Sequence, residues 1–162
     1  MMSKHTLTLL QQIAHGIAVH FGNNCEVLVH DLTADYTNSS IVIIENGNVT
    51  MRKIGDGPSH VVLEALHSDH KTLEDKLSYL TKTKDGRILK SSSMFIRGEN
   101  NAIEAVFSIN LDITPMQMAE NVLQQLISPI SAKNEPENIP QNVNDLLDEL
   151  IEQSVRIVGK PV

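Results

Sequence analysis

Residues 79–111 read YLTKTKDGRILKSSSMFIRGENNAIEAVFSINL, and they carry the strongest indication of the fold class. It contains three β-prone runs, at residues 79–84, 87–97 and 102–111. Turn-forming residues separate them, at Asp85-Gly86 and at residues 98–101. Because connections this short join strands that run antiparallel, we predict three consecutive antiparallel strands.

The preceding segment adds a helix and further strands. Apolar residues at helical spacing predict a helix over residues 6–21, which Gly22 ends. β-prone runs follow at residues 25–32, 41–44 and 49–53. Asn46-Gly47 is a strong hairpin signal, and it predicts direct pairing of the last two runs. With helices expected over residues 61–76 to cross one face, the fold class is α+β with an antiparallel sheet of about five strands.

The carboxyl-terminal part divides into a helix, a linker and a second helix. Thr114-Pro115 opens the first helix, since Thr caps helices well and Pro fits the first turn. Residues 133–141 follow, and they contain Pro136, Pro140 and mixed charge, which are typical of a linker. Apolar residues from Val143 onward then predict an amphipathic helix that stops at Gly159. We expect a main domain over residues 1–128, a linker over 129–142 and a connector helix over 143–162.

Charge and composition limit the partners of the chain. A formal net charge of −7 argues against a broad basic surface, so this chain alone should bind duplex DNA weakly. Cys25 is the only cysteine, which excludes an intramolecular disulfide and a Cys-based zinc site. No apolar run reaches the ~20 residues of a membrane span, and the amino terminus lacks an apolar signal core. We expect a cytoplasmic protein with no membrane partner.

Several runs of the sequence are similar to those of a known regulator family. They are residues 22–27, 30–32, 44–47, 82–92 and 110–114, together with Tyr79. Over residues 6 to about 127 the chain resembles the YheO-like PAS domain, the sensor half of DauR-type helix-turn-helix transcriptional regulators. The tail, residues 143–162, is similar to the segment that leads into the family's helix-turn-helix.

The resemblance implies a PAS-like fold and a sensory and dimerisation module that responds to a small metabolite. DNA would be contacted only through a helix-turn-helix beyond Val162. Regulators of this type read pseudo-symmetric sites, so a homodimer is implied. An apolar stripe is the candidate for covering the sheet or a partner: Leu10, Ile13, Ala14, Ile17 and Phe21. The alternative is a stand-alone ligand-binding or protein-interaction adaptor without DNA binding, ranked ahead of a metal-dependent hydrolase.

Residue patterns that suggest catalysis have simpler explanations. His30-Asp31 invites a metal phosphohydrolase interpretation, but successive side chains of a strand point to opposite faces. Residues 67–70 have ligand-like spacing in a hydrophilic stretch typical of a solvated loop. Residues 82–87 lack the glycine spacing of a phosphate loop, and no Ser or Cys stands in a nucleophile elbow. We therefore expect no enzyme, no metal site and no cofactor.

Strand parity predicts where a ligand would bind. On the last strand, Val106, Ser108 and Asn110 share one face, while Phe107 and Ile109 share the other. Polar groups on a covered face need partners in the protein, in water or in a ligand. We hypothesise a small polar pocket between sheet and crossing helix, which binds a small amino acid or metabolite and is formed by His30, Ser91, Ser93, Ser108 and Asn110. The simpler alternative is that these side chains satisfy one another and nearby backbone.

Overall fold

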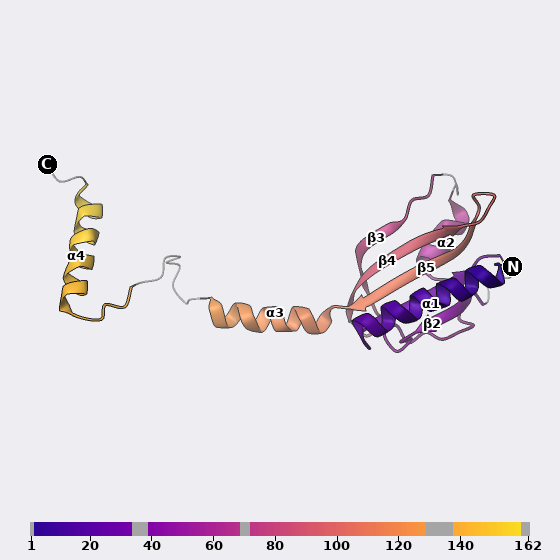
Figure 1. The fold of residues 1–162 in the computed structure, drawn as a ribbon, viewed down its shortest axis with the longest axis horizontal. Helices are drawn as coiled ribbons and strands as arrows, with labels where there is room; N and C mark the ends of the chain where they lie inside the picture. The colour runs from indigo at the N-terminus through magenta and orange to yellow at the C-terminus, as the bar shows by residue number, and fades with distance from the viewer. Residues whose placement is uncertain (1, 34–38, 69–71, 129–137, 160–162) are drawn as a thin grey trace. The chain divides into compact units, whose positions relative to one another are not determined.

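A computed structural model describes residues 2–33, 39–68, 72–128 and 138–159 (Figure 1). The chain divides into two compact units, Met1–Leu123 and Gln124–Val162. The first unit contains α1 (Lys4–Phe21), β1 (Cys25–Asp31), β2 (Ile41–Glu45), α2 (His60–His67), β3 (Lys76–Lys82), β4 (Ile88–Arg97) and β5 (Ile103–Asp112). Helix α3 (Thr114–Ile127) begins in the first unit and ends in the second, which also contains α4 (Val143–Val158).

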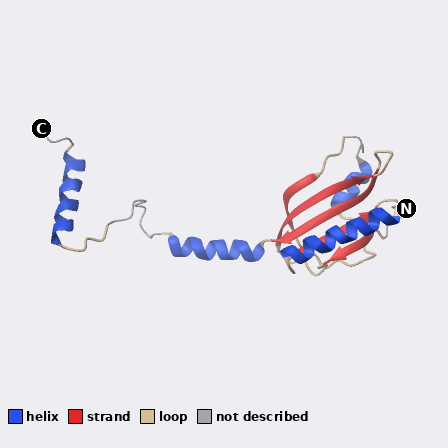
Figure 2. Ribbon diagram, in the orientation of Figure 1, coloured by secondary structure: helices blue, strands red, loops and turns tan. Residues whose placement is uncertain are grey.

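Five strands form one sheet in the order β2-β1-β5-β4-β3, and each neighbouring pair is antiparallel (Figure 2). The pairs β3–β4 and β4–β5 are the connections predicted from residues 79–111. Strand β5, the last of the five in the chain, lies between β1 and β4. The predicted α+β class with an antiparallel sheet is therefore confirmed.

Helix α1 covers one face of the sheet (Figure 1). Its buried residues Leu10, Ala14 and Ala18 recur every four positions and therefore lie on one side of the helix. They pack with buried strand residues, among them Val27, Val29, Ala105 and Phe107. Small alanine side chains at the contact allow the helix to lie close to the strands.

The stripe predicted on this helix is only partly buried. Leu10 and Ala14 belong to the core, and Ile17 packs against it while partly buried. Ile13 and Phe21 are exposed instead. The helix ends as predicted at Gly22, which adopts the positive φ of 80° that glycine accepts most readily.

Helix α2 packs on the other face of the sheet, through Val62 and Ala65. These two residues form a second apolar cluster with Phe95 of β4 and Val106 of β5. The sequence predicted helical structure as far as Lys76. The helix ends at His67 instead, residues 72–75 form no helix, and β3 begins at Lys76. Residues 69–71 of that predicted stretch lie outside the described residues.

Residues 49–53, all of them described, form no strand, contrary to prediction. Strand β2 ends at Glu45, and the chain then folds into a compact turn over residues 46–52. Two backbone hydrogen bonds close it, from the Val49 N–H to the Asn46 carbonyl and from the Arg52 N–H to the Gly47 carbonyl, each 3.0 Å long. A Cβ on Gly47 would lie 2.3 Å from the Arg52 carbonyl oxygen, so the turn requires glycine there.

Asn46, half of the expected hairpin signal, anchors this turn to the start of β1. Its side-chain amide donates to the backbone carbonyls of Gly22 and Cys25, over 3.1 and 2.8 Å. The backbone of Asn46 adopts a positive φ of 52°, as the hairpin signal implies. Contacts with a neighbouring segment therefore replaced the direct pairing that the local sequence favours.

Helices α3 and α4 bury no described residue. Helix α4 begins after Asn142, whose side chain accepts a hydrogen bond from the Asp145 N–H over 3.0 Å, and ends at Gly159 as predicted. Of the predicted linker and connector, residues 129–137 and 160–162 lie outside the described residues. No helix among the described residues is long and apolar enough to cross a membrane.

The contact between α1 and the sheet can be tested with two adjacent leucines. Leu10 is 6% exposed and Leu9 is 47% exposed. Leu10→Ala should lower the free energy of unfolding by about 2–5 kcal/mol, because it removes buried methyl groups and leaves a cavity. Leu9→Ala, the matched control, should cost less than about 1 kcal/mol. Urea denaturation measures both, and equal losses would contradict the described orientation of the helix.

Candidate ligand-binding cavity

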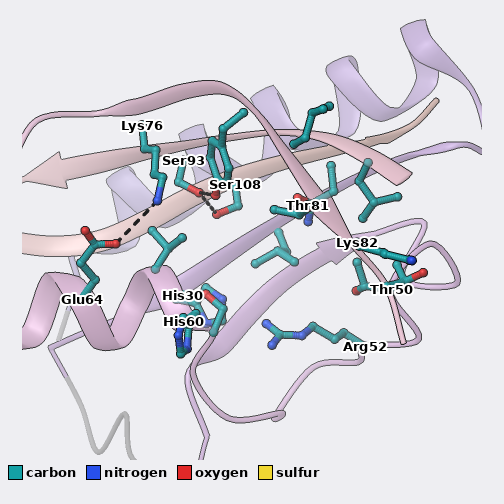
Figure 3. Close-up of a pocket in the computed structure, with 18 of the residues that line it drawn as sticks. His30, Thr50, Arg52, His60, Glu64, Lys76, Thr81, Lys82, Ser93 and Ser108 are labelled. Atoms are coloured by element: carbon teal, nitrogen blue, oxygen red, sulfur yellow. Dashed lines mark hydrogen bonds and ion pairs between the residues drawn. The ribbon is translucent and has the colours of Figure 1, made fainter. Parts of the chain in front are cut away.

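The sheet face opposite α1 borders an open cavity of about 540 Å³ (Figure 3). Strands β1, β3, β4 and β5 contribute to its walls, together with α2 and the turn over residues 46–52. Pockets of about 300–1,000 Å³ are typical of small-molecule sites. The cavity therefore has room for a metabolite.

The structure brings the five predicted pocket residues to this one face of the sheet. In the strand register Ser91 lies opposite Asn110, Ser93 opposite Ser108, and His30 opposite Val106. Four of the five line the cavity: His30, Ser93, Ser108 and Asn110. Ser91 is only 1% exposed and lies among its strand neighbours instead.

Ser93 and Ser108 belong to a row of hydroxyl groups that crosses three strands. The Tyr79 hydroxyl and the Ser93 Oγ lie 3.0 Å apart, and the Ser93 and Ser108 Oγ atoms lie 3.1 Å apart. Each hydroxyl has one donor hydrogen and two acceptor lone pairs. The row therefore retains hydrogen-bonding capacity for a molecule in the cavity.

Asn110 and Ser91 belong to a second, longer network. The Thr81 Oγ1 lies 2.7 Å from the Ser91 Oγ, which donates to the Asn110 Oδ1 over 2.8 Å. The Asn110 Nδ2 donates to the Glu26 Oε1 over 2.9 Å. The Ser91 hydroxyl thus has hydrogen-bond partners on both neighbouring strands, as expected if this side chain serves the protein rather than a ligand.

Glu26 is the residue at which this network converges, and the sequence analysis did not single it out. Its carboxyl group is fully buried, and the Oε2 accepts from both the backbone N–H and the hydroxyl of Thr50, over 3.2 and 2.7 Å. Burial raises the pKa of Glu26, while the hydrogen bonds from Thr50 and Asn110 act in the opposite direction. The available signal was strand parity, because Glu26 shares a face with Leu28 and His30.

His30 is fully buried at the wall of the cavity. Its Nδ1 lies 2.8 Å from the Ser40 Oγ, but its Nε2 is buried and has no hydrogen-bond partner. Burial, together with the nearby charge of Arg52, lowers the pKa of His30 to about 4. The imidazole is therefore neutral at neutral pH, and its Nε2 is a buried ring nitrogen without a hydrogen-bond partner among the described residues.

Arg52 also lines the cavity and was not predicted as a site residue. The turn over residues 46–52 places it there, with its guanidinium group reaching toward His30 and His60 (Figure 3). The same turn holds Thr50 against Glu26. Sequence reasoning missed Arg52 because it assigned residues 49–53 to a strand.

Metal-binding chemistry receives no support from the described residues, where no three His, Cys, Asp or Glu side chains are placed to hold one ion. His30 faces the cavity, and the next residue, Asp31, points to the other sheet face, where its Oδ1 accepts from the Thr33 N–H and hydroxyl. Asp69 and His70, from the second ligand-like pattern, lie outside the described residues.

The model of the YheO-like PAS domain family matches residues 1–128. This chain belongs to the family of YheO-like PAS domains. Its similarity to the family covers α1, the whole sheet, α2 and α3. The cavity described above thus lies entirely within the family domain.

Relatives include proteins longer than the matched segment. Protein YheO of Escherichia coli K12 is 30% identical over 105 residues, which cover 64% of this chain and 42% of YheO. The transcriptional regulator DauR of Pseudomonas aeruginosa is 29% identical over 127 residues, which cover 77% of this chain and 56% of DauR. The chain therefore spans about half the length of these relatives. Among solved structures, an RNA-binding light-oxygen-voltage receptor aligns with a TM-score of 0.42 and 17% identity, over 75% of this chain and 38% of that chain.

The buried His30 predicts a loss of stability in mild acid. The unfolded imidazole gains a proton near its ordinary pKa of 6.5, whereas the folded one stays neutral down to about 4. The unfolded state therefore binds more protons between these values, and stability falls as pH falls through this window. We expect a loss of about 2 kcal/mol between pH 7 and pH 5 from this residue. The raised pKa of Glu26 acts in the opposite sense, because the folded carboxyl takes up its proton first.

Urea denaturation at pH 7 and at pH 5 measures this effect. His30→Gln should reduce the difference between the two pH values, whereas His5→Gln, at an exposed position of α1, should leave it unchanged. An undiminished difference in His30→Gln would show that another group causes the acid sensitivity.

Proposed function

We propose that this chain is the sensory and dimerisation module of a DNA-binding transcriptional regulator that responds to a small metabolite. Membership of the YheO-like PAS family and the similarity to the transcriptional regulator DauR support the regulatory context. The observation that carries the sensory role is the cavity with a buried, unpartnered ring nitrogen of His30 at its wall. Such an atom gains a hydrogen bond when a ligand enters.

The proposed division of labour places DNA binding outside this chain. Residues 1–128 sense the effector, residues 129–142 link, and residues 143–162 connect to a helix-turn-helix beyond Val162. The net charge of −7 supports this arrangement, because a surface that grips DNA phosphates must be basic. We place the regulator in the cytoplasm, where it meets both DNA and metabolites, and we assign this module no catalytic role.

The proposed homodimer has its support in exposed apolar surface. Helix α3 presents Val122, Leu123 and Leu126, all more than half exposed, and α1 presents Ile13 and Phe21. Two-fold related DNA half-sites require a two-fold related protein. Without a DNA-binding partner module, the same surfaces fit the alternative function of a protein-interaction adaptor.

The sensory role predicts saturable binding of a metabolite in the cavity. Screening small polar metabolites for an increase in melting temperature should identify a ligand, since binding to the native state alone raises stability. Asn110→Ala and His30→Ala should weaken its binding about tenfold, because each removes a hydrogen-bonding group from the wall. Asn121→Ala, which removes the same amide at an exposed position of α3, is the matched control. Unchanged affinity in both cavity variants, measured by calorimetry, would contradict the proposed site.

The regulatory role predicts that the gene continues past the codon for Val162 into a helix-turn-helix. The longer product should bind duplex DNA in a mobility-shift assay, whereas residues 1–162 alone should bind weakly at physiological salt. The metabolite found in the screen should change the affinity of the longer product for DNA.

Two results would contradict the regulatory proposal. A salt-resistant, sequence-specific mobility shift of duplex DNA with residues 1–162 alone would show that this chain itself binds DNA. A reading frame without a helix-turn-helix would favour the adaptor alternative. Light scattering on residues 1–162 tests dimerisation separately, and a monomer at high concentration would contradict the proposed homodimer.

A further inference from the structure

Arg52 contributes a positively charged guanidinium group to the wall of the cavity. Arg52 is half-buried, and its guanidinium group forms no salt bridge with any described residue. Its position is nevertheless constrained, because the Arg52 backbone closes the turn onto Gly47. A guanidinium group held at a cavity wall without a partner is prepared to bind an anion.

Other charges of the wall favour an anion as well. Lys82 and Lys84 also line the cavity, and neither has an ion-pair partner among the described residues. The one acidic side chain of the lining set, Glu64, pairs with Lys76 over 3.9 Å. The cavity therefore carries an excess of positive charge on a chain whose net charge is −7.

Glu26, buried near the cavity, lies within electrostatic range of Arg52 but forms no salt bridge with it. Both of its oxygens are already acceptors, one from Thr50 and the other from Asn110. Burial raises the pKa of Glu26, while the charge of Arg52 acts in the opposite direction.

His30 supplies a second group at the same corner of the cavity. When the Ser40 hydroxyl donates to the Nδ1, the proton of the neutral ring resides on the Nε2. The Nε2–H is then the buried donor without a partner. Figure 3 shows the Arg52 guanidinium group reaching toward this ring.

We propose that the Arg52–His30 corner of the cavity binds an oxyanion, the carboxylate or phosphate group of the effector. The guanidinium group donates a pair of parallel hydrogen bonds and supplies the charge, and the His30 Nε2–H donates a third hydrogen bond. The hydroxyl row of Ser93 and Ser108 contacts the uncharged remainder of the molecule. This inference rests on the proposed sensory function and specifies the class of its ligand.

The test uses residues 1–162 and three small probes at constant ionic strength. Sodium acetate and inorganic phosphate represent the two oxyanion sources, and acetamide is the uncharged isostere of acetate. In ¹H–¹⁵N NMR titrations, at least one anion should shift the His30 ring and Arg52 side-chain signals saturably. Acetamide should bind at least about tenfold more weakly, since charge-assisted hydrogen bonds are the stronger ones. The ring nitrogen shifts should also identify the Nε2–H tautomer.

Variants assign the effect to Arg52. Arg52→Gln should weaken anion binding at least about tenfold, and Arg52→Lys should weaken it less, because a lysine keeps the charge without the planar fork. Lys90→Gln removes the same charge from an exposed position on the other sheet face and should change binding less than about twofold. Melting curves of each variant confirm that it is folded.

The inference is overturned if acetamide binds as well as acetate, if neither anion binds, or if Arg52→Gln binds the anions unchanged. A metabolite that binds the cavity while both anions fail would overturn the oxyanion site and leave the sensory function standing. Anion binding at Arg52 in a protein whose longer product never contacts DNA would instead overturn the regulatory function and leave this site standing.

Discussion

The buried carboxyl group of Glu26 is the constraint on which much of this domain depends. A carboxyl group removed from water destabilises the folded state unless hydrogen bonds compensate it. Thr50 and Asn110 supply these bonds, and they connect the turn over residues 46–52 to β1 and β5. The turn that satisfies Glu26 is also the turn that places Arg52 on the cavity wall. Fold stability and the candidate site therefore share the same contacts.

The two faces of the sheet have different chemical tasks. The face under α1 is apolar and closed by small and branched side chains such as Ala14 and Val29. The opposite face mixes an apolar cluster under α2 with polar rows that border the cavity. Strand β5 carries both Ser108 and Asn110 on that face and leads through Ile113 directly into α3. A change in the cavity thus occurs on the strand that continues into the next helix.

Strand alternation indicated which polar side chains share a sheet face, but it gave no sign of the positive charge at the cavity. Period-two alternation predicted that Ser91 and Ser93 share a face of one strand, and that Ser108 and Asn110 share a face of the next. Their union with His30 was a hypothesis, and strand pairing brings all five residues to one face. Glu26 was within reach of the same argument. Arg52 could not be placed at the cavity by this argument. The local signal of Asn46-Gly47 favours a hairpin, and it does not reveal that contacts with a distant segment replace the hairpin. The side chain of Asn46 bonds the carbonyls of Gly22 and Cys25, more than twenty residues away in the chain.

The antiparallel order of β3, β4 and β5, the end of α1 at Gly22 and the family of the domain can all be predicted from the amino-acid sequence. These features depend on local turn residues, alternation and collinear sequence similarity, all of which are present in the chain before it folds. The buried side of α1, the end of α2 at His67 and the closure of the loop after β2 onto β1 became clear from the folded chain alone. Those outcomes depend on contacts between distant segments, such as Thr50 with Glu26, whose energies arise only when the sheet brings the partners together.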